Sequence, residues 1–309
     1  MEIRKPMDVP EQFPVRKSRK QKEAFRQEVM KYAQSLGYDA AVEKGSFGVK
    51  NVVIGNPESA KFLVTAHYDT CARMIVPNLL TPCSLILFVL YQVLISALML
   101  APAFAVDALM VWLTGSYLLS YIAFLSVFAL TFWLMLAGPA NPSNANDNTS
   151  GVVTVLEIAE SLPNNLRDNV CFVLFDLEEL GLIGSASYRK KHKKASNRQV
   201  VLNLDCVGDG DHIYFFPTAK VKKDARKLEK FQKICGTFGK KKIVFRKKGF
   251  SVYPSDQAQF PYGVGICALN KNKLGLYLSR IHTPKDTVLD IHNVNLLRAA
   301  LTTYLCSGE

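Results

Sequence analysis

The sequence predicts an α/β protein with a mixed, mostly parallel sheet flanked by helices and interrupted by a transmembrane helical hairpin. Short apolar runs typical of buried strands alternate with helical segments along most of the chain. In contrast, the 73 residues from Met74 to Asn146 carry a single charged side chain, Asp107, whereas the other 236 positions carry 63. A folded domain large enough for its own core is therefore interrupted by an apolar insert.

The expected elements follow from these patterns in chain order. Ser18 and Gln21 have the spacing of a capping box, and apolar residues at helical spacing follow until Gly37, which predicts a helix over 19–36. We then expect strands over 39–43, 50–54 and 62–66, a helix over 151–162, a strand over 170–175, a helix over 184–194, strands over 200–204 and 213–216, a helix over 221–238, strands over 243–245 and 265–269, and a closing helix over 293–305. The runs over 62–66 and 200–204 are almost entirely apolar, as expected for strands covered on both faces.

The insert contains two charge-free runs, 74–106 and 108–146. Each can hold the ~20 residues that span a bilayer. Trp112 and Trp133 lie roughly 31 Å apart along a helix and are expected to mark the two interfaces of the second span. We assign residues 76–139 to the hairpin and residues 1–75 and 140–309 to the folded domain. A buried helical hairpin and a dimerisation arm are the alternatives.

The net charge of +12 favours anionic partners, and two basic clusters, 189–194 and 240–248, are candidates for contact with anionic lipid headgroups. Nucleic acid is not expected as a partner, because no recognised binding module accompanies this charge. The seven cysteines form no Cys-x-x-Cys pair and predict a reducing compartment. The polar N-terminal residues lack the apolar core of a secretory signal, which also indicates the cytoplasm.

Side chains that bind metals follow several predicted strands and loops: His67-Tyr68-Asp69, Asn146-Asp147-Asn148, Glu178-Glu179, Asp205 and His282. Each segment alone is common on protein surfaces. A carboxylate that directly follows a buried strand, such as Asp205, must nevertheless find a partner. Imidazole and carboxylate groups suit zinc, and the excess of carboxylates favours two ions because one carboxylate can bridge a pair.

The other histidines give weaker signals. His192 lies in a basic run and His292 opens the last predicted helix, so we expect both to be exposed. His212, near two aspartates, is a minor candidate for a pocket residue.

Together the segments resemble the co-catalytic two-zinc aminopeptidases. The matching stretches are AHYDT, NANDNTSGVV, FDLEELGLIGSASY, NLDCVG and IHTPKDT, which occur in the order typical of that family within residues 62–287. The resemblance implies a zinc exopeptidase-like fold and a membrane-anchored, zinc-dependent aminopeptidase that hydrolyses N-terminal peptide bonds.

The resemblance also implies roles for individual residues. Two Zn²⁺ ions would share five ligands: His67, Asp147, Glu179, Asp205 and His282. His67, Asp147 and Asp205 would hold one ion, and Asp147, Glu179 and His282 the other, with Asp147 bridging. Glu178 would be the general base toward a metal-bridging water, and Asp69 would orient His67.

The sequence departs from the family at three places. Leu177 stands where the family usually has Gly, and Gln257 stands where we expect His, so both departures are expected to affect the substrate pocket. The third departure is the insert itself. A same-fold glutaminyl cyclase and a catalytically inactive membrane-bound binding module are the alternatives, although cyclases build their pocket with tryptophan and both tryptophans here lie in the insert.

The metals constrain the topology. His67 and Asp147 must reach one centre, so the insert crosses the bilayer an even number of times. No Lys or Arg flanks Asp107, the expected turn, which places the folded domain in the cytoplasm of a multi-pass cell-membrane protein. About ten residues separate Asp69 from Leu79, at most ~36 Å of extended chain, so the site is expected to face the membrane. The expected substrate is a peptide with a free N-terminus.

Overall fold

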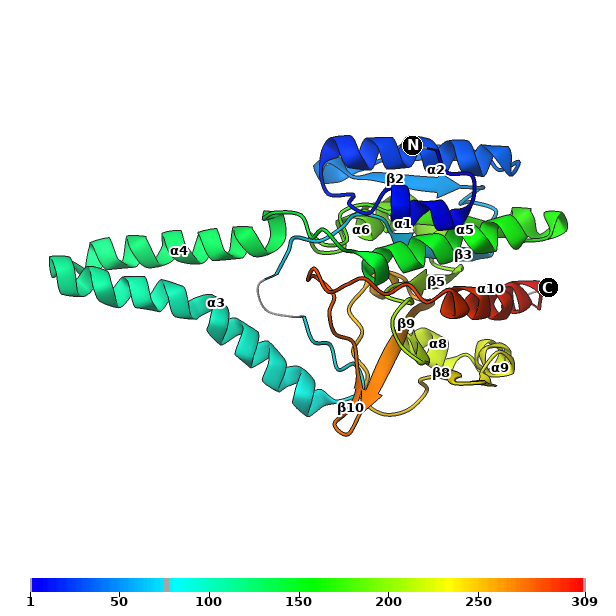
Figure 1. Cartoon of the computed structure of the whole chain (residues 1–309). Helices are drawn as coiled ribbons and strands as arrows, with labels where there is room; N and C mark the ends of the chain where they lie inside the picture. The colour runs from blue at the N-terminus through cyan, green and yellow to red at the C-terminus, as the bar shows by residue number, and fades with distance from the viewer. Residues whose placement is uncertain (1, 75–77, 308–309) are drawn as a thin grey trace.

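The computed structural model describes residues 2–74 and 78–307. It shows a single mixed sheet with helices on both faces, and two long helices that project away from it (Figure 1). This architecture confirms the predicted fold class. The predicted boundary between residues 75 and 76 lies outside the described residues.

The sheet has ten strands. They are β1 (Ala40–Lys44), β2 (Lys50–Ile54), β3 (Phe62–His67), β4 (Val170–Phe175), β5 (Val200–Leu204), β6 (His212–Pro217), β7 (Gly236–Phe238), β8 (Lys241–Phe245), β9 (Gly263–Asn272) and β10 (Gly275–Tyr277). The order is β1-β2-β4-β3-β5-β9-β6-β8-β7, and β10 pairs with β9. The four central strands β4, β3, β5 and β9 run parallel to one another.

The helices are α1 (Val9–Gln12), α2 (Arg19–Ser35), α3 (Leu85–Thr114), α4 (Tyr117–Ala137), α5 (Gly151–Ser161), α6 (Ile183–Lys191), α7 (Lys193–Ser196), α8 (Ala219–Lys223), α9 (Ala225–Lys233) and α10 (Ile291–Cys306). Short turns of other helix types are η1 (Pro6–Asp8), η2 (Ser46–Gly48), η3 (Ala145–Ser150), η4 (Asn164–Asn169) and η5 (Asp256–Gln259). The predicted capping box of α2 is confirmed, because the Ser18 hydroxyl accepts a hydrogen bond from the Gln21 backbone and the Gln21 side chain accepts one from Ser18.

Alternate side chains of the central strands divide the core between the two faces of the sheet. On one face, Val64 and Leu202 pack with residues of α2, α5 and α10 in the largest apolar cluster. On the other face, Leu63 and Val201 pack with Tyr188 of α6. Burial on both faces explains why these strands read as continuous apolar runs in the sequence.

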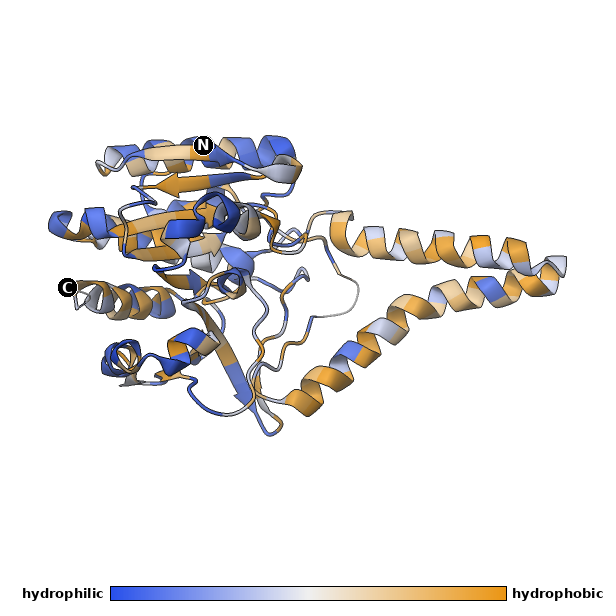
Figure 2. Cartoon of the chain, turned by 180° about the vertical axis from the view of Figure 1, so that it is seen from behind, coloured by the Kyte–Doolittle hydropathy of each residue, from blue (hydrophilic) through white to orange (hydrophobic). Residues whose placement is uncertain are grey.

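Helices α3 and α4 form an antiparallel hairpin that extends beyond the domain, and most of its residues are apolar (Figure 2). Both helices have the length and composition needed to cross a membrane, and their side chains are almost all outside the core of the chain. The alternative of a hairpin buried within this chain is therefore wrong.

Two expectations about the hairpin also need correction. Asp107 was expected at the turn, but α3 continues past it to Thr114 and the turn falls at Gly115, which has the left-handed φ of +63°. Trp112 and Trp133 lie on different helices rather than at the two ends of one span. The single charge of the insert predicted a turn at Asp107. The free-energy cost of one carboxylate in an apolar helix is, however, lower than the cost of the backbone hydrogen bonds that a break would leave unmade.

Two further expectations differ from the structure. The predicted helix over 221–238 is instead α8, α9 and the strand β7, because Asp224 caps a new helix through a hydrogen bond from the Lys227 backbone. His192 was expected to be exposed but is buried, with its ring nitrogens 2.8 Å and 2.7 Å from carboxylate oxygens of Glu43 and Glu58.

Candidate metal centre and active site

The site forms where parallel strands end side by side. Strands β4, β3 and β5 are adjacent, so their carboxyl ends meet at one edge of the sheet. His67 is the last residue of β3, Asp205 directly follows β5, and Glu178 lies three residues after β4. Ligands commonly bind at such an edge in α/β proteins. The strand ends therefore bring together three segments that are distant in the sequence.

The remaining two predicted ligands come from outside the central strands. Asp147 lies in η3, directly before α5, and His282 lies in the connection between β10 and α10 with a left-handed φ of +60°. The carboxylate of Asp286 joins these segments, because it accepts hydrogen bonds from the backbone N–H groups of Asn146 (2.8 Å) and Asp147 (3.0 Å). Sequence reasoning gave Asp286 no role, although it belongs to the IHTPKDT stretch.

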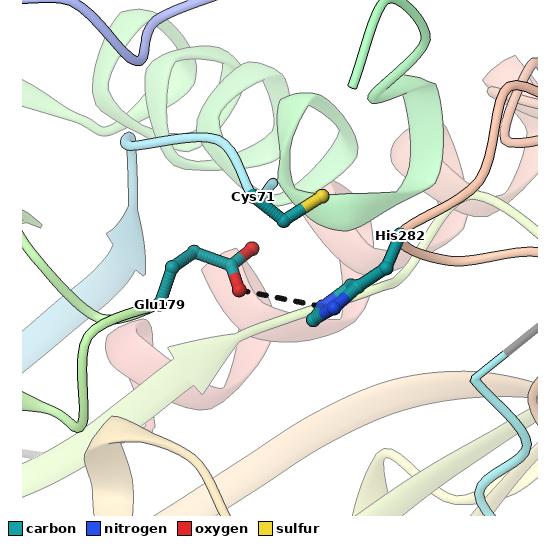
Figure 3. A group of neighbouring side chains, drawn as sticks. All are labelled: Cys71, Glu179 and His282. Carbon is teal, nitrogen blue, oxygen red and sulfur yellow. Dashed lines mark ion pairs between the residues drawn. The ribbon is translucent and has the colours of Figure 1, made fainter. Parts of the chain in front are cut away.

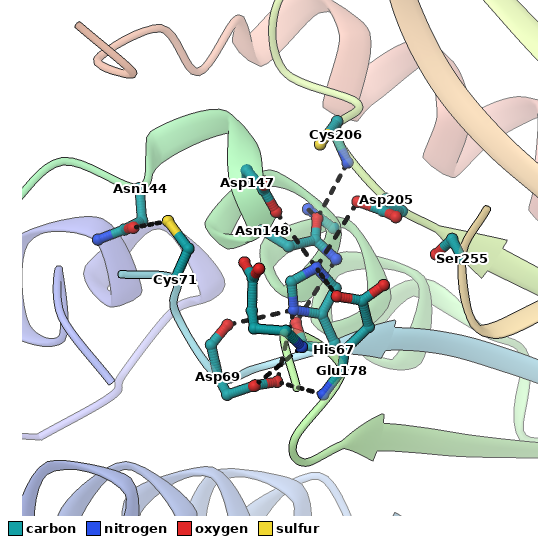
Figure 4. Close-up of polar contacts among 12 residues, drawn as sticks. His67, Asp69, Cys71, Asn144, Asp147, Asn148, Glu178, Asp205, Cys206 and Ser255 are labelled. Atoms are coloured by element: carbon teal, nitrogen blue, oxygen red, sulfur yellow. Dashed lines mark hydrogen bonds and ion pairs between the residues drawn. The ribbon is translucent and has the colours of Figure 1, made fainter. Parts of the chain in front are cut away.

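All five predicted metal-binding side chains converge. Figure 4 shows three of them, His67, Asp147 and Asp205. His67 Nε2 lies 3.3 Å from Asp147 Oδ1 and 3.6 Å from Asp205 Oδ1. On the other side of the same carboxylate, His282 Nε2 lies 3.0 Å from Asp147 Oδ2 and 3.3 Å from Glu179 Oε2. The two oxygens of Asp147 thus face two different histidines.

These separations match a metal centre. Ligand atoms placed tetrahedrally at 2.0 to 2.1 Å from a zinc ion are about 3.3 Å apart. The four distances just given lie around that value. In addition, Glu179 Oε1 is buried and has no hydrogen-bond partner among the described residues, which is costly unless a cation neutralises it. The donor set of imidazole nitrogens and carboxylate oxygens therefore fits zinc.

Asp69 contacts the Nδ1 side of the His67 ring, away from the ligands that face Nε2. Its Oδ1 lies 3.6 Å from His67 Nδ1, and its backbone carbonyl lies 3.1 Å from the same nitrogen. The carboxylate also accepts hydrogen bonds from the backbone N–H groups of Glu178 (3.1 Å) and Glu179 (3.3 Å). Asp69 is therefore well placed to orient both the imidazole and the pair of glutamates.

A buried arginine that sequence reasoning missed lies near these carboxylates. Arg16 is fully buried and donates hydrogen bonds to the Tyr68 carbonyl (2.6 Å) and to the Thr149 hydroxyl (3.1 Å). Burial lowers the pKa of Arg16 to about 10, although the charges of Asp69 and Asp147 oppose this shift. The guanidinium thus ties the N-terminal segment to β3 and η3 and places a positive charge behind the acidic centre.

The glutamates are strongly perturbed. Burial raises the pKa of Glu178 well above its usual value, and the nearby charges of Asp256 and Glu179 add to the effect. Burial also raises the pKa of Glu179 to about 8, with the charge of Asp147 as a further cause. A raised carboxyl pKa near neutrality is typical of a group that accepts and returns a proton in catalysis.

The same carboxylates also raise the pKa values of both histidines, because they stabilise the charged imidazolium form. Burial disfavours the charged form of His282, but the charges of Glu179 and Asp147 outweigh it and raise its pKa to about 9. His67 likewise has a raised pKa, because Glu178 and the other neighbouring carboxylates outweigh its burial. In the absence of metal, protons occupy positions that a cation would take.

Cys71 is a further neighbour that sequence reasoning did not single out. Its thiol sulfur lies within 4.8 Å of ligand atoms of Glu179 and His282. Figure 3 shows the three side chains as neighbours. The residue is buried, and its thiol donates a weak hydrogen bond to Asn144 Oδ1 at 3.5 Å. The only signal in the sequence is its place two residues after Asp69.

The departures from the family pattern occupy different positions. Leu177 has a φ of +56°, in the left-handed region that favours glycine, which explains why Gly is usual there. Gln257 is buried, accepts a hydrogen bond from Asn203 and donates one to the Tyr253 carbonyl, so it belongs to the interior behind β5.

His212 lies at the start of β6 and joins none of the candidate metal-binding groups among the described residues.

Comparison with known proteins agrees with this geometry. The sequence profile of Peptidase family M28 matches residues 131–305, more than half of the chain. The chain belongs to Peptidase family M28. The match confirms the resemblance drawn from the five motifs and supports a peptidase hydrolase.

Individual relatives cover smaller parts of the M28 chain. It is 28% identical over 127 residues to the alkaline phosphatase isozyme conversion protein of Escherichia coli, which spans 40% of this chain and 34% of the relative. It is 41% identical over 73 residues to aminopeptidase YwaD of Bacillus subtilis, which spans 23% of this chain and 16% of the relative. The matches thus span about a third or less of these proteins.

Two solved structures share the fold of the M28 chain. The LapA aminopeptidase of Legionella pneumophila superposes with a TM-score of 0.57 at 14% identity, covering 97% of this chain and 67% of that one. The glutaminyl cyclase of Tannerella forsythia superposes with a TM-score of 0.55 at 15% identity, covering 96% and 94%. The fold therefore accommodates both kinds of protein, and the choice between them depends on the site.

The perturbed groups predict how the metal-free protein responds to pH. Glu179 and His282 have folded-state pKa values of about 8 and about 9, above their ordinary values, so the folded chain holds more protons than the unfolded chain. Stability must then fall as the pH rises from the ordinary pKa values of these groups, 4.5 and 6.5, toward their values in the folded chain. We expect the Tm of chelator-treated protein to decrease from about pH 5 to about pH 8, measured by thermal unfolding in detergent.

The Glu179→Gln variant is the control for this prediction. Because an amide does not titrate, its Tm should depend less steeply on pH than that of the unmodified protein. Zinc binding should also release protons, which calorimetry in buffers of different ionisation enthalpy detects. A Tm that rises with pH in the metal-free protein would contradict the prediction.

Proposed function

We propose that this M28 protein is a membrane-anchored zinc aminopeptidase that holds two Zn²⁺ ions and removes N-terminal residues from peptides. The observation that carries the proposal is the position of Asp147, whose two carboxylate oxygens face His67 and His282 respectively. A carboxylate placed in this way can bridge two ions. His67 and Asp205 would complete one site, and Glu179 and His282 the other.

When bound, zinc would lower the pKa of water to about 7 and polarise the scissile carbonyl. Glu178 Oε2 lies 4.0 Å from His67 Nε2, and a ligand atom of Glu178 lies within 4.8 Å of those of His67 and Asp205. In this proposal it stays free of the metal and acts as the base. From this position its carboxylate could take a proton from the attacking water and return it to the leaving amine. Asp69 would hold both His67 and the backbone of Glu178 in position during this transfer.

The acidic surroundings also indicate the substrate. Asp147, Asp205, Glu178 and Glu179 surround the proposed centre. A positively charged α-amino group next to the scissile bond would meet carboxylate oxygens there. This argument favours a free N-terminus.

We propose that residues 1–75 and 140–309 form the catalytic domain and residues 76–139 a spanning hairpin, with the catalytic domain in the cytoplasm. The length and apolar surface of α3 and α4 support the spans. The turn between them contains no Lys or Arg. In contrast, the exposed Lys247 and Lys248 precede a segment that is joined to the residues before α3, because the Val252 N–H donates a hydrogen bond to the Pro82 carbonyl. These lysines would meet anionic headgroups on the cytoplasmic side.

The alternatives gain less support from the site. A glutaminyl cyclase has the same fold, but Trp112 and Trp133 are 80% and 55% exposed on the hairpin and cannot line the site. An inactive binding module would not need Glu178 next to a complete set of ligands.

Substitutions at the site test the assignment of base and bridge. Glu178→Gln should retain about two zinc ions while kcat falls by ~10² or more, because only the proton acceptor is lost. Asp147→Asn should lose both metal and activity, because one ligand serves both ions. Metal content by mass spectrometry and hydrolysis of aminoacyl amides measure these outcomes.

Glu229→Gln is a matched control, because Glu229 is 69% exposed on α9 and, among the residues that the structure describes, forms an ion pair only with Lys233. It should leave both readouts unchanged. Unmodified protein that is purified gently and contains no transition metal would refute the metal centre.

A comparison of substrates tests the reaction itself. Peptides with a free N-terminus should be hydrolysed at least ~10² times faster than their acetylated forms, since acetylation removes the positive charge that the carboxylates would bind. A peptide with N-terminal glutamine should release free glutamine and not be converted into a pyroglutamyl peptide with loss of ammonia. Equal rates for free and acetylated peptides would exclude an aminopeptidase, and ammonia release would favour the cyclase.

Cysteine labelling tests the topology. In a variant without native cysteines, Ser116→Cys at the hairpin turn should react with an impermeant thiol reagent on intact cells. Lys240→Cys on the exposed surface of the domain should react only after lysis. The reverse pattern would invert the orientation, and extraction of the protein by alkaline carbonate alone would reject the spanning hairpin.

A further inference from the structure

The hairpin contributes to the wall of a cavity that begins at the metal centre. The cavity measures about 240 Å³ and contacts both Glu179 and His282. Beyond these two residues it is bounded by Leu80, by Ile95 of α3 and by Leu136 of α4. Both helices thus contribute to the lining, and Figure 1 shows that they meet at the turn and diverge toward the domain.

Contacts with the domain fix the cavity wall in place. Lys17 Nζ donates a hydrogen bond to the Leu136 carbonyl at 3.1 Å, close to the end of α4. Leu80 pairs with Leu278 through two backbone hydrogen bonds of 2.9 Å and 2.8 Å, just before α3 begins. These hydrogen bonds hold the ends of α3 and α4 that lie next to the domain in a defined position beside the site.

The chemistry of the cavity limits what it can hold. Apart from Glu179 and His282, most of the described residues around it are apolar, three are polar and uncharged (Asn78, Tyr91 and Gln92), and none is Lys, Arg or Asp. A charged side chain placed there would lose its hydration without gaining a counter-charge outside the metal ligands. The volume is below the 300 to 1,000 Å³ or so of pockets for drug-sized ligands, so it suits one residue rather than a whole peptide.

We propose that the base of the hairpin forms the pocket for the N-terminal side chain of the substrate, and that this side chain is large and apolar. The proposal rests on the proposed aminopeptidase function and deepens it. Because the pocket lies where the apolar hairpin leaves the domain, its substrates are peptides whose apolar N-terminus is held at the membrane surface. The insert is then part of the active site as well as an anchor.

The test fills the pocket. Ile95→Trp and Leu136→Trp are compared with Leu98→Trp and Leu134→Trp, which lie on the same helices at residues that are 45% and 43% exposed and do not line the cavity. The full chain is reconstituted in nanodiscs of phosphatidylcholine and phosphatidylglycerol. The kcat/KM is measured for the p-nitroanilides of Phe, Leu, Ala and Lys, together with the zinc content of each variant.

The unmodified enzyme should prefer Phe and Leu over Lys by about tenfold or more. The two filling variants should lose about tenfold or more in kcat/KM for Phe, keep Ala within about threefold and retain zinc. The two control variants should behave as the unmodified enzyme. Calorimetry provides a readout without turnover: Glu178→Gln protein should bind free phenylalanine more tightly than lysine, and Leu136→Trp should remove this difference.

Several results would overturn the proposal. They are an equal loss for Ala and Phe in the filling variants, the same loss in the controls, and an unmodified enzyme that accepts Lys as well as Leu. The last result would leave the aminopeptidase function intact. Failure to cleave any of the four amides would instead refute the proposed function, and the pocket assignment with it.

Discussion

The structure depends on the gathering of buried carboxylates at one edge of the sheet. Asp69, Asp147 and Asp205 are each less than 10% exposed, and Glu178 and Glu179 lie beside them. Like charges cannot be held so closely in a low dielectric unless cations or protons balance them. The raised pKa values of both glutamates and both histidines are the expression of this constraint in the metal-free chain.

Much of the surrounding fold acts to hold those charges. The backbone of the Glu178-Glu179 segment donates to Asp69, and the backbone of η3 donates to Asp286, so main-chain dipoles carry part of the compensation. Arg16 reaches the same region from the N-terminal segment, although it is 131 residues away from Asp147 in the sequence. Each contact joins two loops, which allows a site assembled from five segments to keep one geometry.

The hairpin adds a second constraint. It replaces the connection between β3 and η3, the two elements that carry His67 and Asp147. Both ends of the insert must therefore return to the metal centre, whatever the helices do between them. This connection explains why a segment that reads as a membrane anchor also borders the site, and it ties the position of the domain to the bilayer if the helices span it.

The amino-acid sequence by itself determined the elements whose signals are local. Because β2, β4 and β5 are buried on both faces, their apolar runs predicted both ends of each strand correctly. The capping box at Ser18 located the start of α2. The five motifs identified the family and the candidate ligands because their residue types and order are specific. Only the tertiary structure decided what depends on distant contacts. The burial of His192 between Glu43 and Glu58 and the roles of Arg16 and Asp286 each depend on a partner far away in the sequence. The energy of a side chain is set by its neighbours in space, and no local pattern records which neighbours folding will bring.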